Sequence, residues 1–500
     1  MMKQTWKVLA ITLALLLSFT PLLITAFAAV PEAPPGGGGG ASSASPTFTG
    51  ATTITSSVNK SGTKYTSSTG SENALLASGG TSTLKNITVN KTGDASDENA
   101  DFYGTNAAVL AYNAATLNLS GAKITTAAGH ANAVFAYSDG TINISDSVIK
   151  TTANNSGAIM VTGGGTLTAT NVTAQTDGNS SAPIRSDRGG GTLTVNGGSY
   201  TANGQGSPAV YSTADITVNE ATLKSTSAEG VVIEGSNSVT LNNTSLTDNN
   251  TSLNGNSETY KNIFIYQSMS GDASEGTGTF TATDSTITTD HGDTFFVTNT
   301  TAVISLSGNE IVNNDASGAF LRVQSGKWGN SGSNGGSVTL NADNQLIQGD
   351  IIADSISTVA LQLTNASSYT GTINAKQSAK SITLKLDASS TLTLTGDTYV
   401  SSLENESSDN ANINLNGHTL YVNGKAITST AYQKKAVSEQ TTQATTAAVQ
   451  NDESDASKSN TLTYVIIGVL AAAAVTVVVT FVVLKTKKSK AQSIENVKEE

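Results

Sequence analysis

The feature that most constrains the fold is an internal repeat with a period near 25 residues. The stretch "NAAVLAYNAATLNLSGAKITT" (106–126) is followed by a near copy, "ANAVFAYSDGTINISDSVIKTT" (131–152). Aligned on the central apolar residue of each "AVL"-type triplet, successive units lie 25, 25, 25, 26 and 22 residues apart, with anchors at Val109, Val134, Ile159, Ile184, Val210 and Val232. The triplet returns after longer inserts at Phe264, Phe296 and Leu321. The chain is therefore a repeat array.

Each unit is predicted to hold three short strands. After the first anchor comes a pair of alternating apolar residues, such as Leu117 with Leu119 and Ile142 with Ile144. Five residues beyond the pair stands another apolar residue, for example Ile124 or Ile149. Alternation with a period of two is typical of a strand that buries one face.

A unit of this size has too little core to fold alone, so stacking must bury the remaining apolar surface. We expect an all-β fold, a parallel β-helix over residues 47–425, in which strands of successive coils lie about 4.8 Å apart. General strand chirality favours a right-handed coil. The rival fold, a β-sandwich, would show hairpin turns and no fixed period.

The two ends of the chain carry targeting patterns. Lys3 and Lys7, an apolar core and the small-x-small pattern Ala26-Phe27-Ala28 predict a signal peptide over 1–28. A Pro/Gly-rich leader follows at 29–46, and a Ser/Thr/Ala/Gln-rich stalk is expected at 426–460. Residues 461–484 predict a single transmembrane helix, and the basic tail 485–500 predicts that the C-terminus is cytoplasmic. We therefore expect a single-pass protein of the cell membrane with an extracellular ectodomain.

Composition excludes some classes of function. The sequence has no cysteine, so no disulfide holds the exported part together. A net charge of -12 argues against nucleic acid as a partner. Aromatic residues at 5% and charged residues at 13% are too few for an ordinary helical or α/β domain.

The signal sequence, the "PPGGGGG" leader (34–40), coils such as "GTINISDSVIK" (140–150) and the single span resemble the β-helix repeat surface proteins of Gram-positive bacteria. These proteins are described as adhesin-like or pectin-lyase-like. The resemblance implies display on the cell surface and adhesion. No LPxTG-type signal precedes Leu462, so the span itself is expected to be the anchor.

The β-helix polysaccharide lyases and hydrolases raise the question of catalysis. Inverting hydrolases need paired carboxylates about 6.5 to 9.5 Å apart, but the repeats show no acidic residues at equivalent positions of adjacent coils. The best catalytic candidates are Asp290, His291 and Asp293 in "DHGD", for which a polar glycine turn is the simpler explanation. We therefore expect no enzyme.

A calcium site is a second weak candidate, and calcium is the one cofactor to consider. In "GDASDENAD", Asp94, Asp97, Glu98 and Asp101 offer oxygen ligands, although their spacing does not match an EF-hand. An acidic insert between coils explains the segment equally well.

The most informative pattern is a stripe of large residues, each one position after a first-strand anchor. Because the anchor points inward, its neighbour should point outward. Large exposed apolar patches mark binding surfaces, and aromatic rings spaced by coils suit sugar faces. The alternative is that loops such as 248–261 cover the stripe and make it a second core. The stripe comprises Leu110, Phe135, Met160, Arg185, Tyr211, Ile233, Ile265, Val297 and Arg322.

Three hypotheses of function follow. The first is a non-catalytic, membrane-anchored binder of a host or bacterial glycan or surface protein through the side of the β-helix. The second is a tethered carbohydrate-active enzyme, a lyase or glycoside hydrolase, which needs a groove with convergent acids. The third is a structural spacer, which needs neither a groove nor a stripe.

Overall fold

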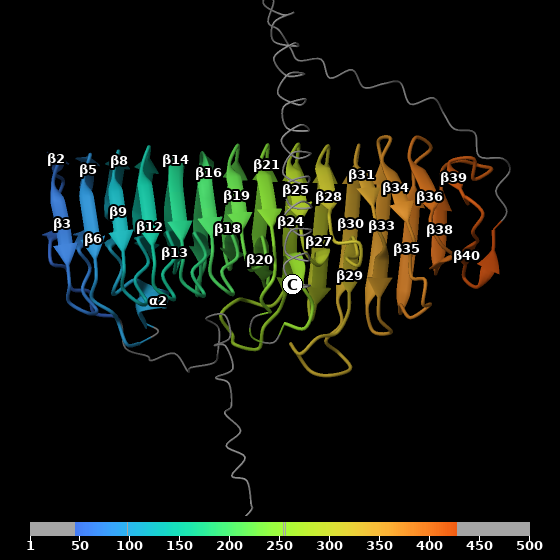
Figure 1. Cartoon of the computed structure of the whole chain (residues 1–500), viewed down its shortest axis with the longest axis horizontal. Helices are drawn as coiled ribbons and strands as arrows, with labels where there is room; N and C mark the ends of the chain where they lie inside the picture. The colour runs from blue at the N-terminus through green and yellow to red at the C-terminus, as the bar shows by residue number, and fades with distance from the viewer. Residues whose placement is uncertain (1–45, 98, 254, 256, 428–500) are drawn as a thin grey trace, which may run out of the picture. The chain divides into compact units, whose positions relative to one another are not determined.

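The computed structural model describes residues 46–427 except 98, 254 and 256, and it is an all-β parallel solenoid. It has about 15 turns with about 25 residues in each coil, which confirms the fold and period predicted from the repeat. Figure 1 shows the strands of successive coils standing side by side along one axis. The right-handed sense of the coil stays a prediction.

One sheet, the lateral sheet, takes the first strand of each coil, and all its pairings are parallel. Its twelve strands are β1 (Thr53–Ile54), β4 (Leu75–Ser78), β7 (Val109–Tyr112), β10 (Val134–Tyr137), β13 (Ile159–Thr162), β15 (Ile184–Ser186), β17 (Val210–Ser212), β20 (Val231–Glu234), β23 (Lys261–Tyr266), β26 (Asp293–Thr298), β29 (Leu321–Val323) and β32 (Ile351–Ala353).

The second sheet has 22 strands in two rows, because its strands bend at a corner. The first row contains β2 (Asn59–Ser61), β5 (Thr81–Lys85), β8 (Thr116–Ser120), β11 (Thr141–Ser145), β14 (Gly165–Thr176), β16 (Gly191–Ala202), β18 (Asp215–Asn219), β21 (Ser238–Asn242), β24 (Thr277–Thr283), β27 (Thr301–Ser307), β30 (Ser337–Asp343), β33 (Thr358–Thr364), β35 (Ser381–Leu386) and β38 (Ser402–Asn405). The second row, to which the long strands β14 and β16 also extend, contains β3 (Lys64–Ser67), β6 (Thr88–Lys91), β9 (Lys123–Thr126), β12 (Val148–Thr151), β19 (Thr222–Ser225), β22 (Ser245–Asp248), β25 (Thr286–Thr289) and β28 (Glu310–Asn313).

Two short sheets complete the C-terminal coils. One contains β31 (Leu346–Gln348), β34 (Ser368–Gly371), β36 (Thr391–Leu394) and β39 (Ile413–Asn414); the other contains β37 (Thr398–Val400), β40 (Leu420–Val422) and β41 (Lys425–Ala426). The last pairing, β40 with β41, is antiparallel.

Side chains that point inward from all the sheets form one continuous apolar core from Ile54 to Leu420. The corner between the two rows is turned by residues with left-handed backbone, among them Asn86 at φ 50° and Asn171 at φ 52°. Asparagine tolerates this conformation because its short polar side chain can bond locally. The repeat therefore sets both the core and the corners.

The register corrects the predicted anchors beyond Val210. Val210 pairs with Val231, while Tyr211 pairs with Val232. Val232 then aligns with Phe264, and Phe264 with Phe296, so these three residues point outward. Their neighbours Ile233, Ile265 and Val297, which were assigned to the outer stripe, belong to the main core. The alignment slipped by one residue because "VVIE" and "NIFIY" are apolar at consecutive positions and carry no alternation.

The outward side chains of the first row form a surface that we call the polar face. Alternate residues of each strand stack into columns from coil to coil. From β5 to β33 the middle column consists of Thr83, Asn118, Asn143, Thr168, Thr194, Thr217, Thr240, Thr281, Ser305, Asn341 and Gln362, and it continues in β35 and β38 with Lys385 and Glu404.

Four long inserts all lie at the two edges of the lateral sheet. Residues 92–108 and 249–260 precede its strands, and residues 267–276 and 324–336 follow them. The first insert contains the short helix α2 (Asn99–Tyr103). In Figure 1, α2 and the longer loops project on the same side of the solenoid.

The predicted signal peptide (1–28), almost all of the leader (29–46) and stalk (426–460), the transmembrane segment (461–484) and the tail (485–500) lie outside the described residues. Within residues 46–427, no helix is long and apolar enough to cross a membrane.

Candidate ligand-binding site

The predicted stripe points away from the main core, but the inserts cover it. Leu110, Phe135 and Met160 are 0% exposed and pack together in a separate apolar cluster. The insert lies directly on them, because a Cβ at Gly104 would stand 2.8 Å from Cγ of Phe135. The expectation of an exposed stripe is therefore wrong here, and the alternative of a second core under loops is right.

The middle of the stripe is charged and also buried. Arg185 is 1% exposed, and its Nη2 lies 3.2 Å from a carboxylate oxygen of Asp187. Burial raises the pKa of Asp187 to about 7, although Arg185 acts in the opposite direction. The neighbouring Arg188 pairs with Asp272 of the 267–276 insert and lies 3.6 Å from the ring centre of Phe102 in α2. These contacts tie two inserts to the lateral sheet.

Next along the stripe, a buried carboxylate joins two tyrosines. Glu234 is 0% exposed and accepts hydrogen bonds from the hydroxyls of Tyr211 at 2.7 Å and Tyr266 at 2.8 Å. It also accepts one from Ser268 in the 267–276 insert. Burial raises the pKa of both tyrosines well above the usual value. The arrangement fixes the insert and leaves Glu234 no access to solvent.

The three catalytic candidates do not share a site. Asp290 is exposed and accepts a hydrogen bond from Asn314 at 2.7 Å. A ring nitrogen of His291 bonds the carbonyl of Asn250. Asp293 begins β26 and is buried against the partly exposed Arg322, whose Nη2 donates to Oδ1 at 3.0 Å. Each side chain has a structural partner of its own.

The calcium candidates also serve separate local roles. Asp94 accepts from the backbone N–H of Gly129 at 2.7 Å, and Asp97 accepts from the N–H of Asn99 at the start of α2. Asp101 is buried against His130, with 2.6 Å between Oδ2 and Nδ1. Glu98 lies outside the described residues. Among the residues that the structure describes, no group of three or more acidic or histidine side chains can hold a metal ion.

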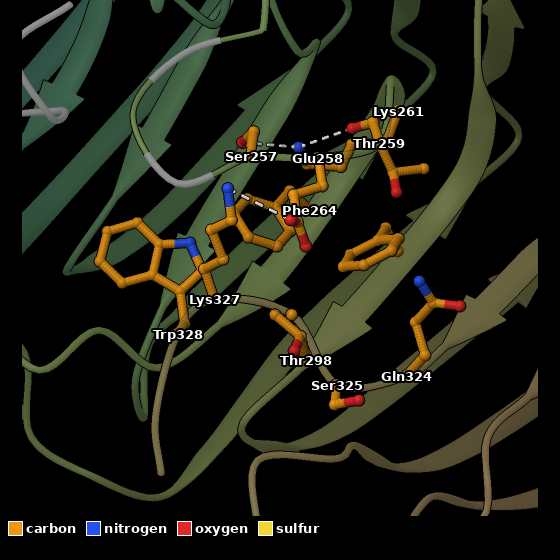
Figure 2. Close-up of a pocket in the computed structure, with 12 residues that line it drawn as sticks. Ser257, Glu258, Thr259, Lys261, Phe264, Thr298, Gln324, Ser325, Lys327 and Trp328 are labelled. Carbon is orange, nitrogen blue, oxygen red and sulfur yellow. Dashed lines mark hydrogen bonds and ion pairs between the residues drawn. The ribbon is translucent and has the colours of Figure 1, made fainter. Parts of the chain in front are cut away.

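The C-terminal part of the stripe ends in a hollow lined by aromatic rings, which we call the aromatic hollow. Phe264, Tyr266 and Phe296 lie on adjacent strands β23 and β26, and Trp328 packs against them from the 324–336 insert. Trp328 and Tyr266 have ring centres 5.0 Å apart. Figure 2 shows Trp328 and Phe264 beside each other, with the 257–261 segment along the opposite edge.

A buried lysine closes one wall of the aromatic hollow. The Nζ of Lys261 lies 3.0 Å from Glu229 and donates to Ser257 Oγ at 2.9 Å and to the carbonyl of Thr259 at 3.0 Å. The same ammonium stands 4.4 Å from the ring centre of Phe264, within the range of a cation–π interaction. Lys261 is thus fully satisfied and holds the 249–260 insert in place.

The rim of the hollow is polar and exposed to solvent. Lys327 and Glu258 form an ion pair at 3.2 Å with side chains that are 62% and 53% exposed. The indole Nε1 of Trp328 is buried and has no hydrogen-bond partner among the described residues. Phe264, Tyr266 and Phe296 are themselves buried, so the surface that the hollow presents is the partly exposed Trp328 together with the polar groups of its rim.

Sequence reasoning missed Trp328, Lys261 and Glu229. Trp328 and Glu229 lie in an insert and a turn that carry no periodicity, and Lys261 begins β23 directly after an insert. One signal was present: Trp328 is one of two tryptophans, and it stands in the glycine-rich stretch "QSGKWGNSGSNGG" (324–336). A large aromatic residue in such a polar loop has to be held by packing or by a ligand.

The fold and site define the class: a parallel β-solenoid repeat protein whose inserts build a hollow on one side. No family model matches the chain, and no curated protein or solved structure is significantly similar to it.

Proposed function

We propose that this chain is a non-catalytic, adhesin-like protein of the bacterial cell surface that binds a glycan in the aromatic hollow. The observation that carries the proposal is the packing of Trp328, from the 324–336 insert, against Phe264 and Tyr266. Sugars present apolar C–H faces that pack on aromatic rings and hydroxyls that bond polar groups. Trp328 offers a partly exposed ring, and the rim beside it offers the polar groups of Lys327 and Glu258.

The targeting patterns supply the setting of this proposal. The segment 461–484 anchors the chain in the membrane, and the right-handed β-helix carries the hollow outside the cell. The bonding of Asp290, His291 and Asp293 to separate partners supports binding over catalysis.

The test is a glycan-array assay on the full-length chain in detergent micelles, with calcium and with a chelator. Trp328→Ala should lower glycan binding at least about tenfold, because aromatic anchors dominate such sites. Tyr399→Ala is the matched control, because Tyr399 is a partly exposed ring stacked on Tyr421 far along the chain.

Glycan binding that Trp328→Ala abolishes and Tyr399→Ala leaves intact supports the proposal. Absence of any bound glycan, or equal loss in both variants, contradicts it. Product analysis on each bound glycan tests the enzyme alternative, because cleavage would show that the hollow or "DHGD" has a catalytic role.

A further inference from the structure

The polar face is a second surface, distinct from the aromatic hollow. It runs along the first row of the long sheet, and Figure 1 shows this row extending over the length of the solenoid. Two shallow hollows lie on it, one across β5 to β14 and one across β24 to β33. All of their walls are formed by the strands of this row, with no contribution from an insert.

The middle column of this face carries no charged residue from Thr83 to Gln362. In the flanking columns, the coils from β8 to β24 contain one charged residue, Asp215. The second row around the corner differs, because its outward positions include Lys123, Lys150 and Lys224. From β8 to β24 this face is thus almost neutral in a chain with a net charge of -12, while Lys85, Asp343, Lys385 and Glu404 stand on it nearer its two ends.

The hydroxyls of this column are available to a ligand. Thr168, Thr194 and Thr217 are partly exposed, and within the described residues their side-chain hydroxyls bond no protein group. The asparagines are ordered in ladders, as in the bond from Asn143 to Asn118 at 2.9 Å and that from Asn242 to Asn219 at 2.9 Å. Each threonine also presents a methyl group, so the column alternates hydrogen-bonding and apolar atoms.

The spacing of these groups is regular in both directions. Equivalent residues of adjacent coils lie about 4.8 Å apart along the axis, and alternate residues of one strand lie about 7 Å apart across it. A ligand that contacts many coils must repeat its own chemistry with a period close to one coil. A polysaccharide that lies along the axis and places one sugar over each coil meets this condition.

We infer that the polar face binds one extended chain of an uncharged polysaccharide, laid along the solenoid axis. Sugar hydroxyls both donate and accept hydrogen bonds, as do threonine hydroxyls and asparagine amides. Their C–H faces match the threonine methyls. From β8 to β33 the outward positions of this row carry no cation, which disfavours nucleic acid and acidic polysaccharides, because these ligands require neutralising charge.

Affinity gel electrophoresis of the full-length chain in detergent micelles tests this inference. The gels contain a soluble β-glucan, a mannan or a dextran, and polygalacturonate serves as the acidic probe. The test variant is Thr168→Val with Thr194→Val and Thr217→Val, which removes three hydroxyls at nearly constant shape. The control is Thr201→Val with Thr247→Val and Thr288→Val, which makes the same change in the second row, where the exposure is similar.

The expected result is retardation of the wild type by an uncharged polysaccharide and not by polygalacturonate. The polar-face variant should bind about tenfold or more weakly, because several hydrogen bonds are lost together. The control variant and Trp328→Ala should bind like the wild type.

Three outcomes would overturn the inference: no retardation by any uncharged polysaccharide, equal weakening in the control variant, or loss in Trp328→Ala alone. The last outcome would place the polysaccharide in the aromatic hollow and so support the proposed function. Conversely, if only the polar-face variant loses retardation, the inference is supported. This holds even if the glycan array shows no binding that depends on Trp328.

Discussion

The lateral sheet and the polar face are built from the same repeat, yet their outer surfaces differ in kind. On the lateral sheet the outward residues are Leu110, Phe135, Arg185 and Tyr211, and all are buried. On the polar face the outward residues are threonine and asparagine, and they stay partly exposed. The difference follows from the turns, because the long inserts occur only at the two edges of the lateral sheet.

Insertion at a coil edge therefore has a fixed structural result. It covers the adjacent outer surface, and the covered positions take apolar or charged side chains that pack under the loop. The corner between the two rows is made by single residues such as Asn86 and Asn171, which leaves no chain to cover the polar face. Substitutions on the two surfaces should thus have very different costs.

The largest effect is expected under the first insert. Phe135→Ala removes a ring that is 0% exposed and should lower the free energy of unfolding by about 3–5 kcal/mol. Chemical denaturation followed by circular dichroism measures it. A loss of unfolding free energy below about 1 kcal/mol would show that the insert does not pack on the ring. The lateral sheet would then not differ from the polar face in how well its outer surface is covered.

A smaller loss is expected for the ion pair that ties the 267–276 insert to the sheet. Asp272→Ala leaves Arg188 unpaired, and because Arg188 is 22% exposed the loss should be about 2–3 kcal/mol. Hydrogen exchange should rise mainly in residues 267–276. Asp272→Asn, which keeps the shape, should have a smaller effect; equal exchange in the wild type and both variants would contradict this role.

The interior of the coil is a third environment. A buried carboxyl group there predicts that the free energy of unfolding depends on pH. Burial raises the pKa of Asp248 to about 8. Between about pH 4 and pH 8 the folded chain keeps this proton while the unfolded chain releases it, so the free energy of unfolding falls as pH rises. Asp248→Asn should reduce this fall and be more stable than the wild type at about pH 8, by about 1 kcal/mol or more. Parallel pH profiles for the two proteins would refute the assignment.

The smallest effect is expected on the polar face. Thr168→Ala should change the free energy of unfolding by no more than about 0.5 kcal/mol, because the side chain is partly exposed and its hydroxyl bonds no group of the described chain. The same denaturation assay measures it beside Phe135→Ala. A loss near that of Phe135→Ala would mean that this face is also part of a packed interior.

The repeat predicted the solenoid because each coil restates the same inward pattern, and a fixed period leaves few other folds. The predicted direction of single side chains was wrong where the pattern loses its alternation. Val232 and Phe264 were expected to point inward, but they point outward. The covering of the stripe was open to either interpretation, since a sequence shows the length of a loop but not the direction in which it folds.

The aromatic hollow was beyond prediction for a related reason. Glu229 and Lys261 form their pair across neighbouring coils, and Trp328 reaches them from a third. Each belongs to a segment of unique length, so no periodic comparison could bring them together. The acidic side chains of the two candidate segments, among them Asp290 and Asp94, instead have local bonding roles.

The stacking of coils also means that each coil touches only its neighbours. Loss or duplication of one complete coil within the gene would shorten or lengthen the protein by about 4.8 Å, and both outer surfaces would keep their pattern. Gain or loss of coils can therefore change the length of such a solenoid in uniform steps without altering the pattern of either outer surface.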